Sequence, residues 1–263
     1  MTHCWICKQS ADTAEHRIKK SDLVNLFGSG SYKDENGVVL VRGTQQIPIL
    51  GPNSKKIKYD KNLCAKCNND LSQPFDRAYE TFINYICQNE DLILKRRFID
   101  FQEVYEDDFV VSQRNLYKYF VKSFGCRLND GKLPIPKDLL SLFPKTSFKT
   151  GLRITFSVCE DHLLFFKSLK IAGKGDIMTL IYPPSKETKP TFQERIKAKI
   201  NSRIRPLQYR WSEQFKWLYV WYWYNWMPDG QLGSTWVADS QFIYLGSFET
   251  LTDEYRKQLL ESR

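Results

Sequence analysis

The sequence Cys4-Trp5-Ile6-Cys7 has a counterpart in Cys64-Ala65-Lys66-Cys67, and Asn68 follows the second pair directly. Each C-x-x-C pair places two sulfur atoms on one tight turn, and four thiolates are the ligand set of a tetrahedral structural zinc ion. Disulfide bonds or free thiols are the alternative for the same residues. A zinc ion held by four thiolates has no open coordination position, so it organises the chain and does no chemistry itself. The two turns therefore predict a zinc-stapled unit at residues 1–95.

The dipeptide Glu15-His16 lies between the two cysteine pairs. This order resembles the HNH endonuclease family, whose catalytic unit is the ββα-metal motif. The residues that carry the resemblance are Cys4, Cys7, Glu15, His16, Cys64, Cys67 and Asn68. The version with Asn after the last cysteine is similar to the junction-resolving endonucleases of phages. The resemblance covers residues 1–90 and implies that Glu15 and Asn68 hold a catalytic Mg²⁺ or Mn²⁺ ion, with His16 as the general base.

Two features depart from the family pattern. Glu15 stands where Asp is common, and the long gap between Cys7 and Cys64 implies an insertion inside the motif. The Asn that orients the histidine in HNH proteins has no clear counterpart, and Asn53 and Asn62 are the candidates for that role.

The residue types fit the hydrolysis of a phosphodiester, which needs an activated water molecule and stabilisation of negative charge on the phosphate. An imidazole titrates near neutral pH, so His16 can accept the proton of that water. The carboxylate of Glu15 and the amide oxygen of Asn68 are hard donors of the kind that Mg²⁺ prefers. Neighbouring residues of an extended strand point to opposite sides, so a bend is needed to bring Glu15 and His16 to one phosphate.

Length and composition favour a soluble protein of one large or two small domains. The chain has 263 residues, of which 42% are hydrophobic, and this is enough to bury a core. We find neither an N-terminal signal pattern nor a run of about 18 uncharged apolar residues, so we expect no membrane contact. The remaining cysteines, Cys87, Cys126 and Cys159, are expected to be free buried thiols, which fits a reducing cytoplasm.

Basic residues indicate where DNA would bind. The formal net charge is +9, and residues 186–210 are rich in Lys and Arg. Such a segment contacts phosphates or forms a solvated helix or loop. The residues that we expect to contact DNA are Lys19, Lys55, Lys56, Arg77, Lys197, Lys199 and Arg203. The alternatives are an exposed insertion loop for Lys55 and Lys56, and a surface ion pair for Arg77.

The expected fold is α+β. The family resemblance implies a ββα-metal unit (1–95), and the periodicity of the remainder predicts a helical connector (96–150) and a C-terminal antiparallel sheet domain (151–263). Apolar residues at helical spacing predict helices over 73–86 and 112–124, the latter stopped by Gly125. Further helices are expected at 136–143, 192–200 and 252–260, and strands at 38–41, 45–50, 152–158, 163–169, 177–182 and 215–226, with one or two further strands within 235–248. The aromatic run at 215–226 fits a strand covered on both faces, and a base-stacking platform is the alternative.

The preferred function at this point is a metal-dependent HNH endonuclease that cuts DNA, in defence against foreign DNA such as viral genomes or in recombination. The competing class is a non-catalytic module that keeps the zinc scaffold and binds nucleic acid or protein. Glu15-His16 discriminates between the two, because a binding module needs no imidazole beside a carboxylate near Asn68.

Overall fold

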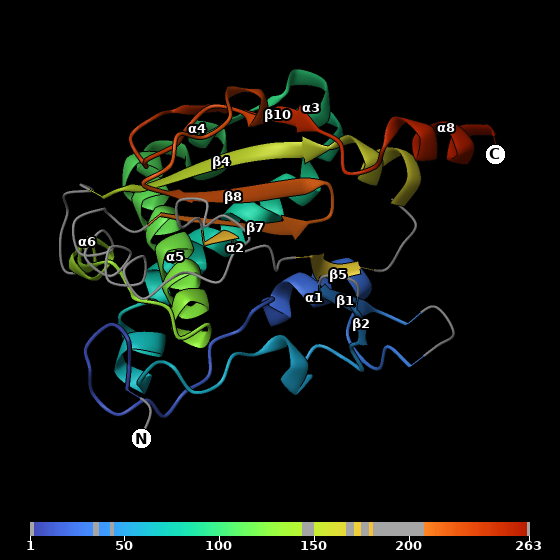
Figure 1. Cartoon of the computed structure of the whole chain (residues 1–263). Coiled ribbons are helices and arrows are strands. Elements are labelled where there is room, and N and C mark those ends of the chain that lie inside the picture. The colour runs from blue at the N-terminus through green and yellow to red at the C-terminus, as the bar shows by residue number, and fades with distance from the viewer. Residues whose placement is uncertain are drawn as a thin grey trace, which may run out of the picture.

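The computed structural model describes residues 3–33, 37–42, 45–143, 150–166, 171–174, 179–180 and 208–261. It is a mixed helix and sheet structure, as expected, with an antiparallel-rich sheet in the C-terminal part (Figure 1). Three predicted features lie wholly or mostly outside these residues: the helix at 192–200, the basic segment at 186–210 and the strand at 177–182. Among the described residues, no helix is both long and apolar enough to cross a bilayer.

A five-stranded sheet forms the centre of the molecule, in the order β10-β4-β8-β7-β6. The strands are β4 (Leu152–Cys159), β6 (Thr179–Leu180), β7 (Tyr209–Phe215), β8 (Leu218–Tyr224) and β10 (Gly246–Phe248). All neighbours are antiparallel except β10, which runs parallel to β4 at one edge. A separate two-stranded pair joins β3 (Phe98–Asp100) to β9 (Phe242–Tyr244).

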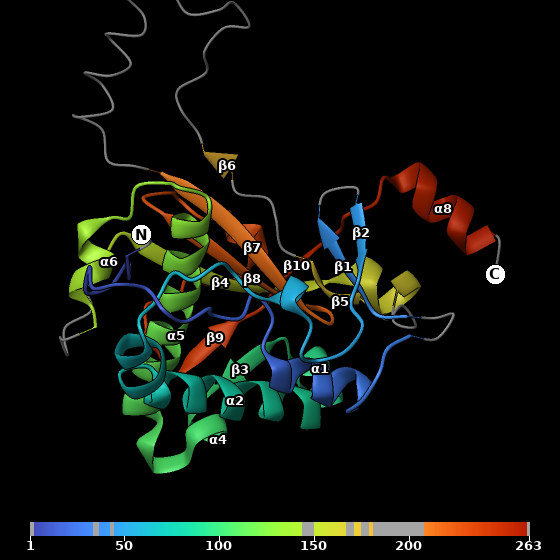
Figure 2. The same cartoon turned by 90° about the horizontal axis from the view of Figure 1, so that it is seen from below.

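Helices α2 (Gln73–Gln88) and α5 (Phe109–Asp130) pack together on one face of this sheet (Figures 1 and 2). Phe120 of α5 meets Phe156 of β4 and Tyr222 of β8 at ring-centroid distances of 5.7 and 6.0 Å. The shorter helical elements are α3 (Glu90–Arg96), α4 (Phe101–Tyr105), α6 (Lys137–Ser141) and α8 (Asp253–Glu261), with single turns at Glu106–Asp108 and Gly230–Leu232. The apolar face of α2 is the one that its spacing predicts, with Phe75, Phe82 and Ile86 buried.

The insertion between the cysteine pairs folds around a small core of its own. It holds α1 (Lys20–Phe27), β1 (Val39–Arg42), β2 (Gln45–Pro48) and a 3₁₀ turn at Lys55–Ile57. Strand β1 pairs with β2 and also, in parallel, with β5 (Ile171–Lys174). The residues that form this core are Leu23, Tyr32, Val38, Leu40, Ile49 and Ile57. The larger core of the molecule is one cluster of buried side chains that includes Cys4 and Trp5 near the N-terminus and Leu245 between β9 and β10.

Helix α5 extends beyond the predicted end, because Gly125 lies inside it and the helix ends only at Asp130. The prediction that Gly125 stops the helix is therefore wrong. The apolar positions continue through Cys126 and Leu128, which are fully buried. Gly125 serves close packing: a Cβ atom there would lie 2.3 Å from the ring of Trp5, which sits between the first two cysteines. The Trp5 indole also donates a hydrogen bond to Cys126 Sγ at 3.3 Å.

Two strand predictions are wrong in part. Residues 163–166 lie in a π-helical turn (His162–Phe166) and not in a strand, and residues 167–169 of the predicted strand lie outside the described residues. Just before this turn, buried Asp161 accepts the backbone N–H of Leu251 at 2.8 Å. The aromatic run at 215–226 does not form one continuous strand. Phe215 ends β7, Lys216 adopts a φ of 50° and turns the chain, and β8 begins at Leu218, so the run spans the turn and the second strand of a hairpin. The hairpin is core: Trp217 and Tyr222 are fully buried.

We predict that Gly125→Ala destabilises the protein by about 2 kcal/mol, because the new methyl group overlaps the Trp5 ring and overpacking outweighs the gain in helix propensity. The denaturant midpoint measures this change. Gly131→Ala is the matched control, since its Cβ would meet no atom closer than 3.5 Å. Equal midpoints for the two variants would contradict the packing of Trp5 on α5.

Candidate functional site

The four predicted zinc ligands lie together. The sulfur atoms of Cys4, Cys7, Cys64 and Cys67 are all within 4.8 Å of one another, and the Cys7 and Cys64 sulfurs are 3.5 Å apart. Three of these side chains are buried and Cys7 is exposed. Four convergent thiols are the donor set that zinc prefers, so this cluster fits a structural zinc ion.

Local hydrogen bonds shape each cysteine turn. In the first turn, the Lys8 N–H donates to the Cys4 carbonyl oxygen at 2.8 Å, and Lys8 adopts a left-handed φ of 67°. In the second turn, the Ala65 N–H donates to the Asp12 carboxylate at 2.8 Å, and the Asn68 N–H donates to the Cys64 carbonyl oxygen at 2.9 Å. The chain then continues through a π-helical turn (Lys66–Asp70) into α2. Asn68 is thereby held directly after Cys67, one turn beyond Cys64.

The segment that carries Glu15 and His16 is extended and pairs with the segment that leads into the second turn. Antiparallel bridges join Thr13 to Leu63 and His16 to Lys58. Between them the Tyr59 N–H donates to the Glu15 carbonyl oxygen at 2.9 Å. His16 therefore lies on one of two paired segments, and the other segment leads through the second cysteine turn into α2.

Glu15 is buried and makes an ion pair that the sequence did not suggest. Its Oε2 atom lies 3.0 Å from Nζ of Lys122, a residue of α5 that is 1% exposed. The same ammonium contacts Asp76 Oδ1 at 3.0 Å and Ser72 Oγ at 3.2 Å. Asp76 also pairs with Lys19 at 2.9 Å. A buried ammonium thus fills a position lined by oxygen atoms from Ser72 at the start of α2, from Asp76 within α2 and from Glu15.

The charges in this network are mutually supporting. Burial alone would lower the pKa of Lys122, but Glu15 and Asp76 raise it above the usual value. Burial would raise the pKa of Asp76, but Lys122 and Lys19 lower it. The half-buried His16 has a lowered pKa, chiefly because of burial, and neighbouring lysines add to this effect while Glu15 opposes it. Its imidazole is therefore neutral near pH 7, which is the state that a proton acceptor requires.

The side-chain oxygen atoms of Glu15 and Asn68 retain acceptor capacity. Oε1 of Glu15 accepts the backbone N–H of His16 at 3.1 Å and keeps a second lone pair. Oδ1 of Asn68 is buried and has no hydrogen-bond partner among the described residues. Asn68 is linked to the network through Ser72, whose hydroxyl donates to the Asn68 carbonyl oxygen. Buried Asn62 also has an unpartnered side-chain amide, whereas Asn53 is exposed.

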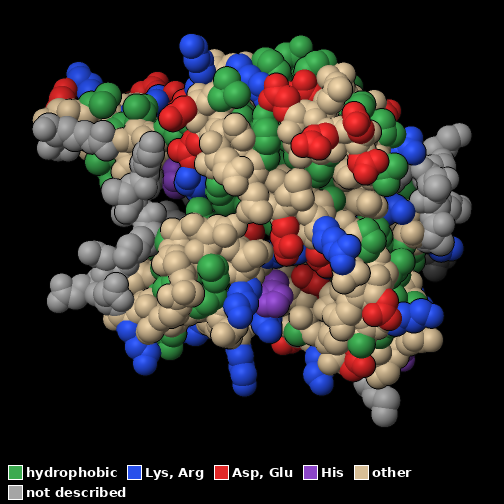
Figure 3. All heavy atoms as spheres, turned by 180° about the vertical axis from the view of Figure 1, so that it is seen from behind, with side chains coloured by type: hydrophobic (Ala, Val, Ile, Leu, Met, Phe, Trp, Pro, Cys, Tyr) green, Lys and Arg blue, Asp and Glu red, His purple; other side chains and the backbone are tan. Residues whose placement is uncertain are grey.

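The predicted DNA contacts occupy different settings. Lys55, Lys56 and Arg77 are exposed. Lys19 is mostly buried and pairs with Asp76 and Glu80. Lys197, Lys199 and Arg203 lie outside the described residues. Figure 3 shows a hollow on the back face with a histidine at its edge, acidic side chains within it, and Lys or Arg side chains around it.

The participation of Lys122 and Asp76 was missed by sequence reasoning, which placed no site chemistry in residues 96–150. A signal does exist. Lys122 stands three residues after Tyr119, on the apolar side of a predicted helix, where a lysine is buried only if it is paired. Its partners come from distant parts of the chain, so the pattern could not identify them.

We predict that the purified chain holds one zinc ion and that Cys67→Ser loses it. Since metal binding stabilises the fold, the melting temperature should fall by roughly 10 °C. Metal analysis and thermal unfolding measure the two effects. Cys87→Ser is the control, because Cys87 is a free thiol outside the cluster. The zinc assignment fails if both variants retain the same metal content as the native chain.

A second prediction concerns Lys122→Met. The change leaves Glu15 and Asp76 without their shared buried cation and should cost about 3 kcal/mol of stability at pH 7. Adding Glu15→Gln should restore part of the loss, and a double-mutant cycle in denaturant measures the coupling. Lys95→Met, at an exposed helix position, serves as the control. Additive effects of the two changes would show that the ion pair does not form.

Comparisons of the chain with protein-family models, with curated proteins and with solved structures give no match. What the chain does is therefore inferred from the contacts of the site itself.

Proposed function

We propose that the chain is a metal-dependent endonuclease that hydrolyses DNA phosphodiester bonds. One observation carries this proposal. The neutral imidazole of His16 lies next to the buried carboxylate of Glu15. Both residues pair with the segment that leads to Asn68, whose buried side-chain oxygen has no hydrogen-bond partner among the described residues. The Asn68 oxygen thus has acceptor capacity that a cation could use. The ββα order of the HNH motif is supported by the paired segments before α2.

The proposed roles follow from the contacts. Glu15 Oε1 and Asn68 Oδ1 would hold Mg²⁺ or Mn²⁺. When bound, such an ion stabilises negative charge on the phosphate and the leaving oxygen. His16 accepts the proton of the attacking water. Lys58, paired opposite His16, contributes positive charge where a phosphate would approach.

Lys122 has a supporting role in this proposal. Its ammonium holds Oε2 of Glu15 and orients the carboxylate, so that Oε1 remains on the His16 side. Lys122 is too deeply buried to touch a substrate. We therefore regard it as a positioning residue.

We predict that native protein nicks or cuts plasmid or branched DNA with Mg²⁺ or Mn²⁺, and that His16→Ala lowers the rate by at least about 10²-fold. His162→Ala is the matched control, because His162 is also buried with a lowered pKa but contacts Gln214 instead. Zinc content and melting temperature should be the same in His16→Ala as in the native chain. If neither protein cuts any DNA form while both bind DNA equally, the chain is a zinc-stabilised binding module.

Asn68→Ala gives a separate readout of the proposed cation. It should raise the Mn²⁺ concentration needed for half-maximal cleavage without changing the zinc content, because only the amide oxygen is removed. An unchanged metal requirement would remove Asn68 from the site.

A further inference from the structure

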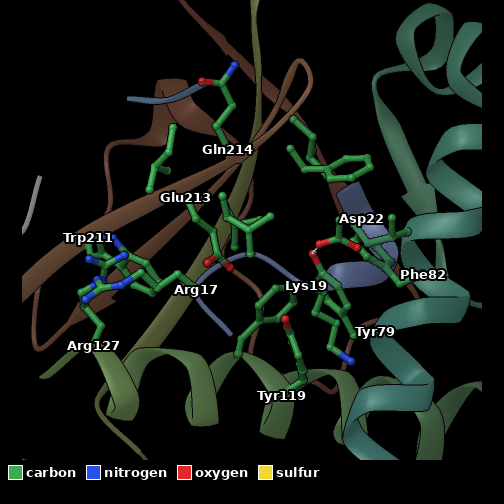
Figure 4. Close-up of a pocket in the computed structure, with 17 residues that line it drawn as sticks. Arg17, Lys19, Asp22, Tyr79, Phe82, Tyr119, Arg127, Trp211, Glu213 and Gln214 are labelled. Atoms are coloured by element: carbon green, nitrogen blue, oxygen red, sulfur yellow. Dashed lines mark hydrogen bonds between the residues drawn. The ribbon is translucent and has the colours of Figure 1, made fainter. Parts of the chain in front are cut away.

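A hollow lies between α1, α2, α5 and the hairpin of β7 and β8 (Figure 4), and it leaves room for only a few water molecules. Its aromatic side chains are occupied by their own neighbours. Tyr79 stacks on Tyr119 with ring centroids 3.9 Å apart, and the guanidinium of Arg127 covers the Trp211 ring at 4.9 Å from its centroid. Aromatic rings that a partner can reach lie elsewhere, at the surface.

The pair of strands β3 and β9 exposes such rings on its outer face. Ile99 and Ile243 lie opposite one another and are fully buried, so the neighbours of each residue in its strand point outward. On this outer face Phe242 is 43% exposed and Tyr244 is 60% exposed. Phe98 packs against both, at ring-centroid distances of 5.9 and 6.0 Å. Exposed rings gathered in this way are typical of a surface that meets a partner, and we call these three rings the aromatic face.

One end of the aromatic face already holds a guanidinium group. Arg96 lies over the Phe98 ring at 4.4 Å from its centroid. The same guanidinium donates two hydrogen bonds to the Glu103 carboxylate, at 2.9 and 2.8 Å. A ring beside a carboxylate is therefore an arrangement that accepts a guanidinium on this surface.

The other end of the aromatic face has the same two groups without a cation. Asp100 faces Phe242 across the strand pair. Its carboxylate caps α4 by accepting the Gln102 N–H at 2.9 Å and accepts the Gln241 side-chain amide at 3.2 Å, and both donors are neutral. Within the described part of the chain, Asp100 forms no ion pair and no cation lies over the Phe242 or Tyr244 ring. A guanidinium from a partner would complete here the arrangement found at the first end.

Acidic side chains surround the aromatic face. Residues 98–108 contain five Asp or Glu residues and residues 239–245 contain one, and neither segment contains Lys or Arg. The exposed turn Glu106–Asp108 lies about 9 Å along α4 from Asp100. Of the three basic residues at 95–97, two are neutralised by ion pairs. The whole chain has a formal net charge of +9, so this local excess of negative charge favours a cationic partner and repels phosphates.

We propose that the aromatic face binds an arginine-bearing segment of another protein, with a guanidinium over the Phe242 and Tyr244 rings and paired with Asp100. Other partners match fewer of these features. Single-stranded nucleic acid would stack its bases on the rings, but its phosphates would meet the surrounding carboxyl groups. A second copy docked through the same face would bring those carboxyl groups against their own copies. A lysine is attracted by the charge, but it lacks the planar group that stacks on a ring while it pairs with a carboxylate.

The test is fluorescence anisotropy of labelled octapeptides with the native chain, without added divalent metal. The peptides alternate glycine with arginine, lysine or glutamate, and a labelled single-stranded DNA octamer represents nucleic acid. We expect the arginine peptide to bind most tightly. Asp100→Asn and Tyr244→Ala should each weaken its binding about fivefold, because the first removes the charge and the second removes a ring face. Asn also caps helices well, so Asp100→Asn keeps the start of α4.

Asp253→Asn and Tyr255→Ala are the matched controls. Both residues are exposed on α8, which lies apart from β3 and β9 (Figure 2), so both variants should bind the arginine peptide as the native chain does. Thermal unfolding verifies that all four variants fold, and their melting temperatures should stay close to the native value, because exposed or half-buried side chains are changed.

Three results would overturn the proposal. The first is no binding of the arginine peptide, or equal binding by the native chain and Tyr244→Ala. The second is equal binding of the arginine and lysine peptides, which would reduce the interaction to net charge. The third is a different occupant: weaker binding of the DNA octamer by Tyr244→Ala would assign the face to nucleic acid, and a dimer that this variant abolishes in sedimentation would assign it to a second copy. DNA cleavage plays no part in these measurements, so their failure leaves the nuclease proposal intact.

Discussion

Convergence of four thiol groups within 4.8 Å of one another sets the position of every other group in the candidate site. Glu15 lies after the first cysteine pair and Asn68 after the second, so a large insertion separates them in sequence. Bringing the two pairs together places the Glu15 strand beside the segment that leads to Asn68. Trp5 then fixes this unit to α5, because the missing side chain of Gly125 leaves room for its ring.

Burial of the Lys122 ammonium is unfavourable by itself, but its ion pairs hold three parts of the chain together. An ammonium without partners in the interior would be strongly unfavourable, so its two carboxylate partners and the Ser72 hydroxyl must be in place when the chain folds. This requirement ties α5, α2 and the Glu15 strand into a single arrangement. It also leaves one oxygen of Glu15 committed and the other available, which a pair of apolar residues in the same place would not achieve.

Local patterns predicted much of the fold and part of the site. The cysteine spacing predicted the sulfur cluster, and apolar spacing predicted the buried face of α2, because both depend on neighbouring residues. Gly125 was misread because its small size serves a contact with Trp5, which is remote in sequence. The ion pairs of Lys122 join distant segments, and no periodicity encodes such contacts.

The charged groups around Glu15 form one continuous row. Lys19 contacts Asp76 at 2.9 Å, Asp76 contacts Lys122 at 3.0 Å, and Lys122 contacts Glu15 at 3.0 Å. In such a row each charge is balanced by its neighbours, so a change at one end alters the balance at the other. Loss of the Lys19 ammonium would leave Asp76 to Lys122 alone, and Lys122 would then hold Glu15 less firmly. The four groups therefore act as one electrostatic unit that joins α2, α5 and the residues on both sides of His16, and replacing any one of them would redistribute the charge that the others balance.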